Sequence, residues 1–450
     1  MKNAYFYGDL DEEIYMDAPK GMDIPEGKVL WLHKALYGLK QAGRAWYQKL
    51  QSVMKKFGLK QVPCEPHLFV TQKIVKSKAL TLILPIYVDD IFLIGDKYLT
   101  DQFEHWIGDY LDITILGDAS LFLGIRTIRN RTAQPPFLTL DQEHYTLAML
   151  HKHNVNLEKR SNYLISTLGA NYIERSEDEL KATSEEIRKY QSLIGSLMYL
   201  MLGTQPDIAY AVSRFAHFAH NPSKDHFKAV GRTFAYVNAT ARFAIQYTKS
   251  NKDDIDPFGV CDADYAGELS ARHRRKSTSG SIFFVAGGAV SWSSKLQKVH
   301  AVSTMEAEYI SLYTTGKQAA WIRQIYEAIG FPLANPIYVY CDNKAAISAA
   351  NKEGTHEAKK YIDIKYHYIQ ELVEDDKIQI EHTETESNEA DILTKCLTGK
   401  VFGDKLCLIG FAHSQEFLIS IGSLPSSFSP PSFDTLNLDT SNSTYTDTNE

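Results

Sequence analysis

The chain has 450 residues, carries a net charge of −7 and is 44% hydrophobic. The apolar fraction excludes a disordered polypeptide, and the length predicts about three domains. The longest apolar runs reach about half of the ~20 residues that a membrane span needs, and the N-terminus lacks a signal-peptide core. We therefore expect a soluble, intracellular protein with no membrane partner.

Basic residues gather in two stretches of the chain. Residues 27–60 hold eight Lys or Arg and no acid, and residues 271–298 hold six and no acid. Residues 413–450 hold five acids and no Lys or Arg. The basic stretches suit a phosphate backbone, although each could equally be a solvated face. The five cysteines are scattered without a C-x-x-C pair, which argues against a disulfide framework or a zinc site.

Two adjacent acids interrupt an apolar run in the first third. Residues 41–57 have helical spacing, and Leu80–Val88 and Ile91–Ile94 have strand composition. Asp89 and Asp90 stand between these strands, and neighbouring charges of like sign are costly to bury. The pair therefore lies in a solvated turn or binds a cation. An ordinary hairpin turn would prefer Asn-Gly or Asp-Gly, which favours the cation.

The middle of the chain is predicted to be mostly helical. Ser184–Leu202 is amphipathic, and Pro206 and Pro222 each stand where a first helical residue would. From Phe258 to about Leu397, strand patterns alternate with helices, and the Ser- and Thr-rich end is expected to be disordered. Four parts are thus predicted, with these bounds: 1–137, 138–256, 257–400 and 401–450.

Acids of the C-terminal third occupy strand ends and helix starts. In PFGVCDADY, Asp262 and Asp264 continue the apolar face of a strand. Asp342 ends the strand IYVYCDN, and Asp391 stands in the first turn of a helix that starts in ESNEADILTK. A further acid, Glu308, belongs to a long helix between these strands.

That long helix is predicted to begin at a capping box of Ser303 and Glu306 and to stop at Gly330. Its apolar residues form an inward stripe at helical spacing. Glu308 lies at the edge of this stripe, whereas Glu306 is expected to point away from it.

Each of these acids also has a simple structural explanation. Asp262 could end a strand in a turn, and Asp342 could cap the next helix. Asp391 could complement a helix dipole, and Glu308 could be a solvated rim residue. Together, however, two strand ends and two helix starts can aim four acids at one point, which suits Mg²⁺. Two such ions, about 3.5–4 Å apart, can activate water for phosphodiester hydrolysis.

The same residues carry a family resemblance. The segments CDADYAG, RRKSTSGSIFFVAGGAVSWSSK, STMEAEYISL, VYCDNKAAI, KYIDIKYHYI and NEADILTK resemble the ribonuclease H domain of copia-type LTR retrotransposons. The resemblance implies a ribonuclease H fold and cleavage of RNA in RNA–DNA hybrids. It implies two Mg²⁺ ions, with Mn²⁺ as a substitute, bound by Asp262, Glu308, Asp342 and Asp391. His382 lies roughly where some ribonucleases H keep a mobile histidine, or is simply a strand-end residue.

The upstream residues resemble the reverse transcriptase of the same elements. The matching segments are KNAYFYGDLDEEIYMDAPKG, LHKALYGLKQAGRAWYQKL, YVDDIFLIG, LFLGIR and LIGSLMYLMLGTQPDIAYAV. The resemblance implies that YVDD is the turn of a palm hairpin, where Asp89 and Asp90 bind metal for nucleotide addition. A further palm acid of the family would stand two residues before Lys2, ahead of the chain, and the fingers also belong upstream. We therefore expect weak or absent DNA synthesis.

These inferences predict an α/β and α+β multidomain protein. It would contain a partial polymerase palm, a helical thumb or connection, a ribonuclease H-like mixed sheet with flanking helices, and a disordered tail. Its expected partners are an RNA–DNA hybrid, an RNA template and a DNA primer, with deoxynucleoside triphosphates if the polymerase acts. The compartment would be the cytoplasm, in a virus-like particle, or the nucleus. The alternative is a non-catalytic nucleic-acid-binding remnant of a Pol protein.

Overall fold

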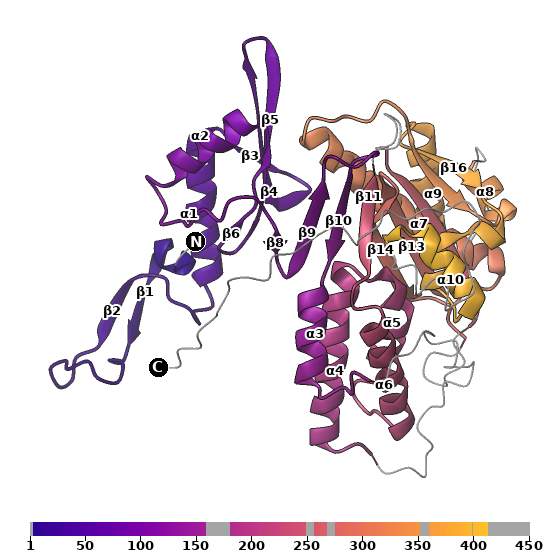
Figure 1. Cartoon of the computed structure of the whole chain (residues 1–450), viewed down its shortest axis with the longest axis horizontal. Coiled ribbons are helices and arrows are strands. Elements are labelled where there is room, and N and C mark those ends of the chain that lie inside the picture. The colour runs from indigo at the N-terminus through magenta and orange to yellow at the C-terminus, as the bar shows by residue number, and fades with distance from the viewer. Residues whose placement is uncertain are drawn as a thin grey trace.

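A computed structural model describes residues 3–158, 181–248, 256–267, 275–351, 360–397 and 399–412. Helices and several separate sheets alternate along the chain, which confirms the expected mixed α/β class (Figure 1). Within the described ranges, no helix is both long and apolar enough to cross a membrane.

The N-terminal part packs two helices against a small antiparallel sheet. The strands follow the order β3-β4-β5-β6, and β7 also pairs with β5. Trp46 and Leu50 of α1 and Phe103 of α2 meet Leu82 and Leu84 of β5 in the core. The elements are η1 (Ala4–Tyr7), β1 (Asp9–Met16), β2 (Leu30–Lys34), α1 (Ala42–Phe57), β3 (Lys60–Val62), β4 (Glu65–Val75), β5 (Lys78–Tyr87), β6 (Asp90–Ile91), β7 (Ile94–Gly95) and α2 (Lys97–Ile107).

The apolar run of the first third forms the expected hairpin. Strands β5 and β6 are joined through Val88 and Asp89. The second strand, expected at residues 91–94, is divided into β6 and β7, but both pieces pair with β5 in one continuous register. Gly95 permits the close pairing, because a Cβ at this position would lie 2.3 Å from a backbone oxygen of β5.

The middle of the chain forms a group of helices (Figure 1). They are α3 (Glu143–Lys152), α4 (Ser184–Gly203), η2 (Pro206–Ile208), α5 (Ala209–Ala216) and α6 (Lys224–Ala239). The predicted amphipathic helix is α4, which begins at a capping box of Thr183 and Glu186. Pro206 begins η2 as predicted, whereas Pro222 lies two residues before α6, which is capped by Ser223 instead.

A five-stranded sheet unites segments from three of the four predicted parts. Its order is β17-β11-β10-β9-β8. The predicted boundary at residue 137 therefore falls on the first residue of β10, within its pairing to β9. Such long-range pairing is invisible in a local sequence pattern. The strands are β8 (Leu121–Phe122), β9 (Ile125–Asn130), β10 (Phe137–Asp141), β11 (Ala244–Thr248) and β17 (Phe411–Ala412).

The predicted start of the tail also needs correction. Helix α10 (Gly399–Leu408) and strand β17 continue the regular structure as far as Ala412. Phe402 and Leu406 of α10 are buried in the main hydrophobic core, which is why this segment is held in place. The rest of the expected tail, residues 413–450, lies outside the described residues.

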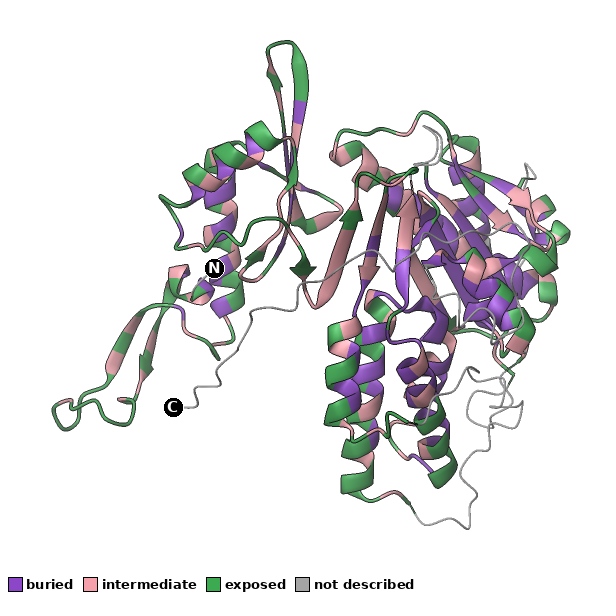
Figure 2. Cartoon of the chain, viewed as in Figure 1, coloured by how far each residue is buried: buried purple, intermediate pink, exposed green. Residues whose placement is uncertain are grey.

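The C-terminal third contains the expected mixed sheet with flanking helices. Its order is β14-β13-β12-β15-β16, with antiparallel pairing from β12 to β14 and parallel pairing of β15 and β16 beside β12. Helices α7, α8 and α9 pack on one face, and η5 and α10 on the other. Many of the buried residues lie in this sheet and in the elements packed on it (Figure 2). The elements are β12 (Phe258–Asp264), β13 (Thr278–Val285), β14 (Gly288–Leu296), α7 (Thr304–Ala328), β15 (Ile337–Cys341), α8 (Lys344–Ala350), α9 (Lys360–Glu374), β16 (Ile378–His382), η4 (Thr385–Ser387) and η5 (Glu389–Leu393).

Helix α7 begins and ends where predicted. Ser303 Oγ accepts a hydrogen bond from Glu306 N at 3.1 Å, and the chain leaves the helix through Gly330 at a φ of +85°. The prediction that Glu306 points away is wrong. Its side chain is buried and accepts a hydrogen bond from Val302 N at 2.7 Å. It folds back over the helix N-terminus, where free N–H groups attract a carboxylate.

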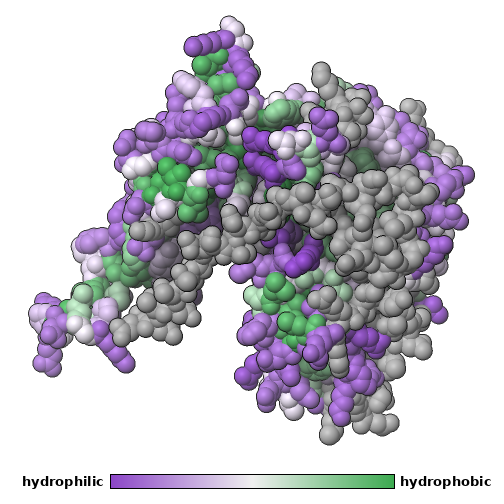
Figure 3. All heavy atoms as spheres, viewed as in Figure 1, coloured by the Kyte–Doolittle hydropathy of each residue, from purple (hydrophilic) through white to green (hydrophobic). Residues whose placement is uncertain are grey.

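Some apolar side chains remain exposed on α3 and α4. Figure 3 shows a hydrophobic patch over this part of the molecule, to which these helices contribute Leu147, Met198 and Leu202, with the exposed Tyr199 beside them in the chain. The Tyr199 hydroxyl donates a hydrogen bond to Leu123 O at 2.6 Å. This contact ties the helical part to the turn between β8 and β9.

Candidate functional site

Asp262 lies at the centre of the C-terminal site. It belongs to β12, between the antiparallel and parallel halves of the sheet, and its side chain is buried. Its carboxylate accepts a hydrogen bond from the Thr394 hydroxyl, and the ammonium of Lys395 lies 3.7 Å away. Burial raises the pKa of Asp262 to about 6 against the opposing effect of Lys395, and Asp391 and Asp342 raise it further. Other negatively charged side chains therefore lie close to the Asp262 carboxylate.

Glu308 reaches the same point from α7. It is 7% exposed, so it is not the solvated rim residue of the alternative explanation. One oxygen, Oε1, accepts a hydrogen bond from Ala263 N at 3.2 Å, and Oε2 has no hydrogen-bond partner. Burial raises the pKa of Glu308 to about 10, with further contributions from Asp262, Cys341 and Asp342. Burial and the neighbouring acids therefore make an uncompensated negative charge on Glu308 unfavourable.

Asp342 follows β15 directly. The explanation that it caps α8 is wrong, because Asn343 Oδ1 accepts the hydrogen bond from Ala346 N at 3.0 Å. Asp342 instead accepts a hydrogen bond from the Thr385 hydroxyl at 2.9 Å. Oxygen atoms of Asp342 and Glu308 and the sulfur of Cys341 all lie within 4.8 Å of one another.

Asp391 approaches from the opposite side, on the short helix η5. Its Oδ1 lies 2.6 Å from the ammonium of Lys395, and its Oδ2 lies 3.3 Å from that of Lys405. Asn388 caps η5 through Ala390 N and donates from Nδ2 to Cys261 O at 3.0 Å. This amide therefore fastens the helix that carries Asp391 to the strand that carries Asp262.

Lys405 is a residue that the sequence analysis missed. It is 2% exposed, although it comes from α10 in the predicted tail. Its ammonium donates to Glu386 O at 2.8 Å and to Asn388 O at 2.5 Å, both in the segment before Asp391. A signal was present, because Lys405 shares a helical face with the apolar residues three before and four after it, Phe402 and Ile409.

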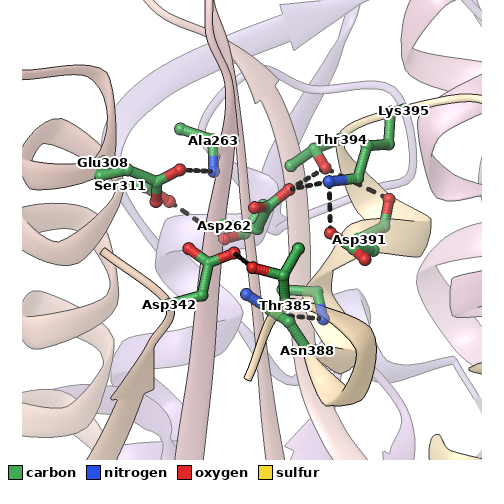
Figure 4. A network of polar contacts seen from close by, with 12 residues as sticks. Asp262, Ala263, Glu308, Ser311, Asp342, Thr385, Asn388, Asp391, Thr394 and Lys395 are labelled. Carbon is green, nitrogen blue, oxygen red and sulfur yellow. Dashed lines mark hydrogen bonds and ion pairs between the residues drawn. The ribbon is translucent and has the colours of Figure 1, made fainter. Parts of the chain in front are cut away.

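The four C-terminal acids thus lie in one polar site (Figure 4), in which Asp262 and Asp391 share Lys395 while Glu308 and Asp342 have oxygens within 4.8 Å of each other. Four carboxylates face two lysines, so an excess of negative charge remains when all the acids are ionised. A buried carboxylate oxygen without a donor is costly unless a cation compensates it. Hard divalent cations take carboxylate oxygens as ligands. The donor set therefore fits Mg²⁺ or Mn²⁺.

Asp89 and Asp90 lie in the separate N-terminal sheet. Asp89 is half-buried in the β5–β6 turn, and Asp90 is exposed. Val88 before them has a φ of +52°, which is strained for a β-branched residue. Trp46 Nε1 donates to Val88 O at 2.8 Å and holds the turn. Among the described residues, neither acid joins a cluster of three potential ligands whose atoms all lie within 4.8 Å of one another.

The structure also shows the surroundings of His382 and of the basic stretches. His382 ends β16, pairs in register with Cys341, and lies 3.8 Å from Glu384. In the first basic stretch, Lys34 and Lys49 both form ion pairs with Asp9. In the second, residues 271–274 lie outside the described residues.

Comparisons with known proteins show which families the sequence is similar to. Residues 1–163 match the family model described as reverse transcriptase (RNA-dependent DNA polymerase). The chain is 37% identical to the retrovirus-related Pol polyprotein from transposon TNT 1-94 of Nicotiana tabacum, over 92% of this chain and 31% of that protein. It is 33% identical to the corresponding polyprotein from transposon RE2 of Arabidopsis thaliana, over 89% and 26%. The chain thus spans only 26–31% of the length of these curated relatives.

Among solved structures, the foamy viral protease-reverse transcriptase in complex with dsDNA aligns with 80% of this chain and 62% of its own, at 12% identity and a TM-score of 0.43. RNase H1 from Halobacterium salinarum NRC-1 aligns with 31% of this chain and 94% of its own, at 19% identity and a TM-score of 0.24.

The match over residues 1–163 and the curated relatives place the molecule in the class of retrotransposon reverse transcriptases. More narrowly, the chain belongs to the family of copia-type retrotransposon Pol polyproteins, as the resemblance predicted.

Proposed function

We propose that the C-terminal domain, from β12 to α10, hydrolyses RNA in RNA–DNA hybrids with two divalent cations. The observation that carries the proposal is the group of acids around Asp262: Glu308 and Asp342 have oxygens within 4.8 Å of each other, Asp391 shares Lys395 with Asp262, and the buried Glu308 Oε2 has no hydrogen-bond partner. Buried polar atoms usually have a hydrogen-bond partner, and a bound cation would satisfy this oxygen. A cation-binding network accounts for it directly.

In this proposal the metal ligands are Asp262, Glu308, Asp342 and Asp391. When bound, the cations supply an activated water and stabilise the leaving oxygen of the phosphodiester. Lys395 keeps two of the carboxylates together, because its ammonium lies 2.6 Å from Asp391 and 3.7 Å from Asp262. Thr385 orients Asp342 through its hydroxyl. These contacts fix carboxylates that would otherwise repel one another.

DNA synthesis at the Asp89–Asp90 turn is the second activity that we propose. The family match over residues 1–163 supports it, with an RNA template, a DNA primer and deoxynucleoside triphosphates as partners. Unlike Glu308 and Asp342, these two acids belong to no cluster of three potential ligands in the part of the chain that the structure describes, and we expect extension to be much weaker than cleavage. Positioned metals lose their effect when their geometry is incomplete.

The test is hybrid cleavage and primer extension measured side by side on one preparation. The change Asp342→Asn should abolish cleavage of a labelled RNA–DNA hybrid in Mg²⁺ or Mn²⁺ without unfolding the protein. The matched control is Asp375→Asn, an exposed acid of the same domain that pairs with Lys377. Binding of the hybrid without any cleavage would favour the non-catalytic alternative. Robust, Asp89-dependent extension would refute the expectation of a weak polymerase.

A further inference from the structure

Two of the five cysteines meet beneath the C-terminal site. Cys261 directly precedes Asp262, and Cys341 directly precedes Asp342. Each follows a residue of the parallel β12–β15 pair, Val260 and Tyr340 respectively. Both residues are fully buried, both thiols are free of disulfides, and they lie close enough to interact electrostatically. The fold therefore places sulfur next to oxygen ligands where the sequence shows only scattered cysteines.

The Cys341 thiol faces two of the acids. Its sulfur and ligand oxygens of Glu308 and Asp342 lie within 4.8 Å of one another. Ligand atoms at 2.0–2.3 Å from one ion lie at most about 4.6 Å apart, so small side-chain movements would bring all three onto a common ion. The unpartnered Oε2 of Glu308, in a side chain only 7% exposed, supplies an oxygen that no other group satisfies.

We propose that Cys341, Glu308 and Asp342 form a binding site for a thiophilic divalent cation such as Zn²⁺, with Cys261 as an adjacent second thiol. A thiolate and two carboxylates provide three ligands of the kinds that Zn²⁺ accepts, and water completes a tetrahedron. Binding converts the Cys341 thiol into a metal thiolate and releases its proton to solvent. Mg²⁺ has no comparable affinity for sulfur, so this site selects soft cations over hard ones.

The consequence depends on the proposed nuclease function. A soft cation at this site would occupy Glu308 and Asp342 and so remove two of the four acids proposed to hold Mg²⁺. Micromolar Zn²⁺ would then inhibit hybrid cleavage in a manner that depends on Cys341. Binding itself does not depend on cleavage, so the two proposals can fail separately.

The binding test uses Cd²⁺ as a probe, because its thiolate complexes absorb in the ultraviolet. The full chain would carry Ser at Cys64, Cys396 and Cys407, which leaves the two buried thiols. We expect one Cd²⁺ per chain with a thiolate-to-metal band, and at least a tenfold weaker affinity without this band after Cys341→Ser. Asp342→Asn should weaken binding yet retain the band, and this provides a second variant if Cys341→Ser does not fold.

The specificity control is Asp375→Asn in the same background, which should bind Cd²⁺ like the parent. Unchanged Cd²⁺ affinity in both Cys341→Ser and Asp342→Asn, or no thiolate band in the parent, would overturn the proposed site. If Cd²⁺ binds as expected but the parent cleaves no hybrid in Mg²⁺, the nuclease proposal fails and the soft-metal site stands.

Discussion

Replacing Lys405 by Met removes the one charge of α10 that reaches the site while keeping a long side chain. The ammonium now lies 3.3 Å from Asp391 Oδ2 and donates to two carbonyl oxygens before η5. Removing one partner of a buried ion pair costs about 3–5 kcal/mol. Since Asp391 would keep Lys395 as a partner, we take the lower figure, about 3 kcal/mol.

A loss of about 3 kcal/mol corresponds to roughly a 100-fold increase in local opening, at 1.4 kcal/mol for each factor of ten. We expect amides of η5 to exchange with deuterium about 100-fold faster in Lys405→Met. The free energy of local opening of η5 would then be lower than the free energy of unfolding of the sheet. Hybrid cleavage should fall 10- to 100-fold, because a misplaced ligand disturbs the geometry of catalysis.

The matched control is Lys400→Met on the same helix, where the lysine is exposed. It should change neither exchange nor cleavage. If η5 of Lys405→Met exchanges at the wild-type rate while the protein cleaves normally, Lys405 does not position Asp391, and the reasoning from burial and distance is wrong.

Three further changes test other parts of the structure. Burial raises the pKa of Asp207 from 3.8 to about 7. The contribution of the protonated Asp207 side chain to folding stability is therefore complete below pH 3.8 and is lost as the pH rises through 7. Denaturation across this range should show a loss of about 4 kcal/mol that Asp207→Asn abolishes. Trp46→Phe removes the hydrogen bond to Val88 O; we expect about 1 kcal/mol of local destabilisation and lower primer extension at unchanged hybrid cleavage. Equal losses in both assays would contradict a local role. Gly280→Ala would place a Cβ 2.6 Å from Thr394 and 3.0 Å from Ala390 O, so cleavage should fall at least tenfold by displacement of η5. Gly195→Ala, with no atom within 4 Å, should leave cleavage unchanged.

Local patterns predicted much of the fold. The helical spacing before Gly203 predicted α4, and the apolar alternation up to Asp262 predicted β12. The stripe of α7 placed Glu308 at its inward edge. These predictions succeed because helical and strand periodicities are properties of neighbouring residues. Two errors concerned local choices between neighbouring polar side chains: Glu306 accepts a hydrogen bond from Val302 N and is buried, and Asn343 caps α8 in place of Asp342. Other errors arose where contacts are distant, as for Lys405 and the boundary within β10.

The sequence by itself determined which acids are available and that two of them stand in or directly after predicted strands, whereas the pairing of these strands came from the structure. Only the tertiary structure decided what surrounds them: Lys405 from a segment taken for a tail, and Cys261 and Cys341 side by side under the carboxylates. It also decided that β17, β11 and β10 share a sheet. The physical reason is that periodicity tells which face of an element is buried. The partner on that face is set by pairing and packing between residues far apart in the chain.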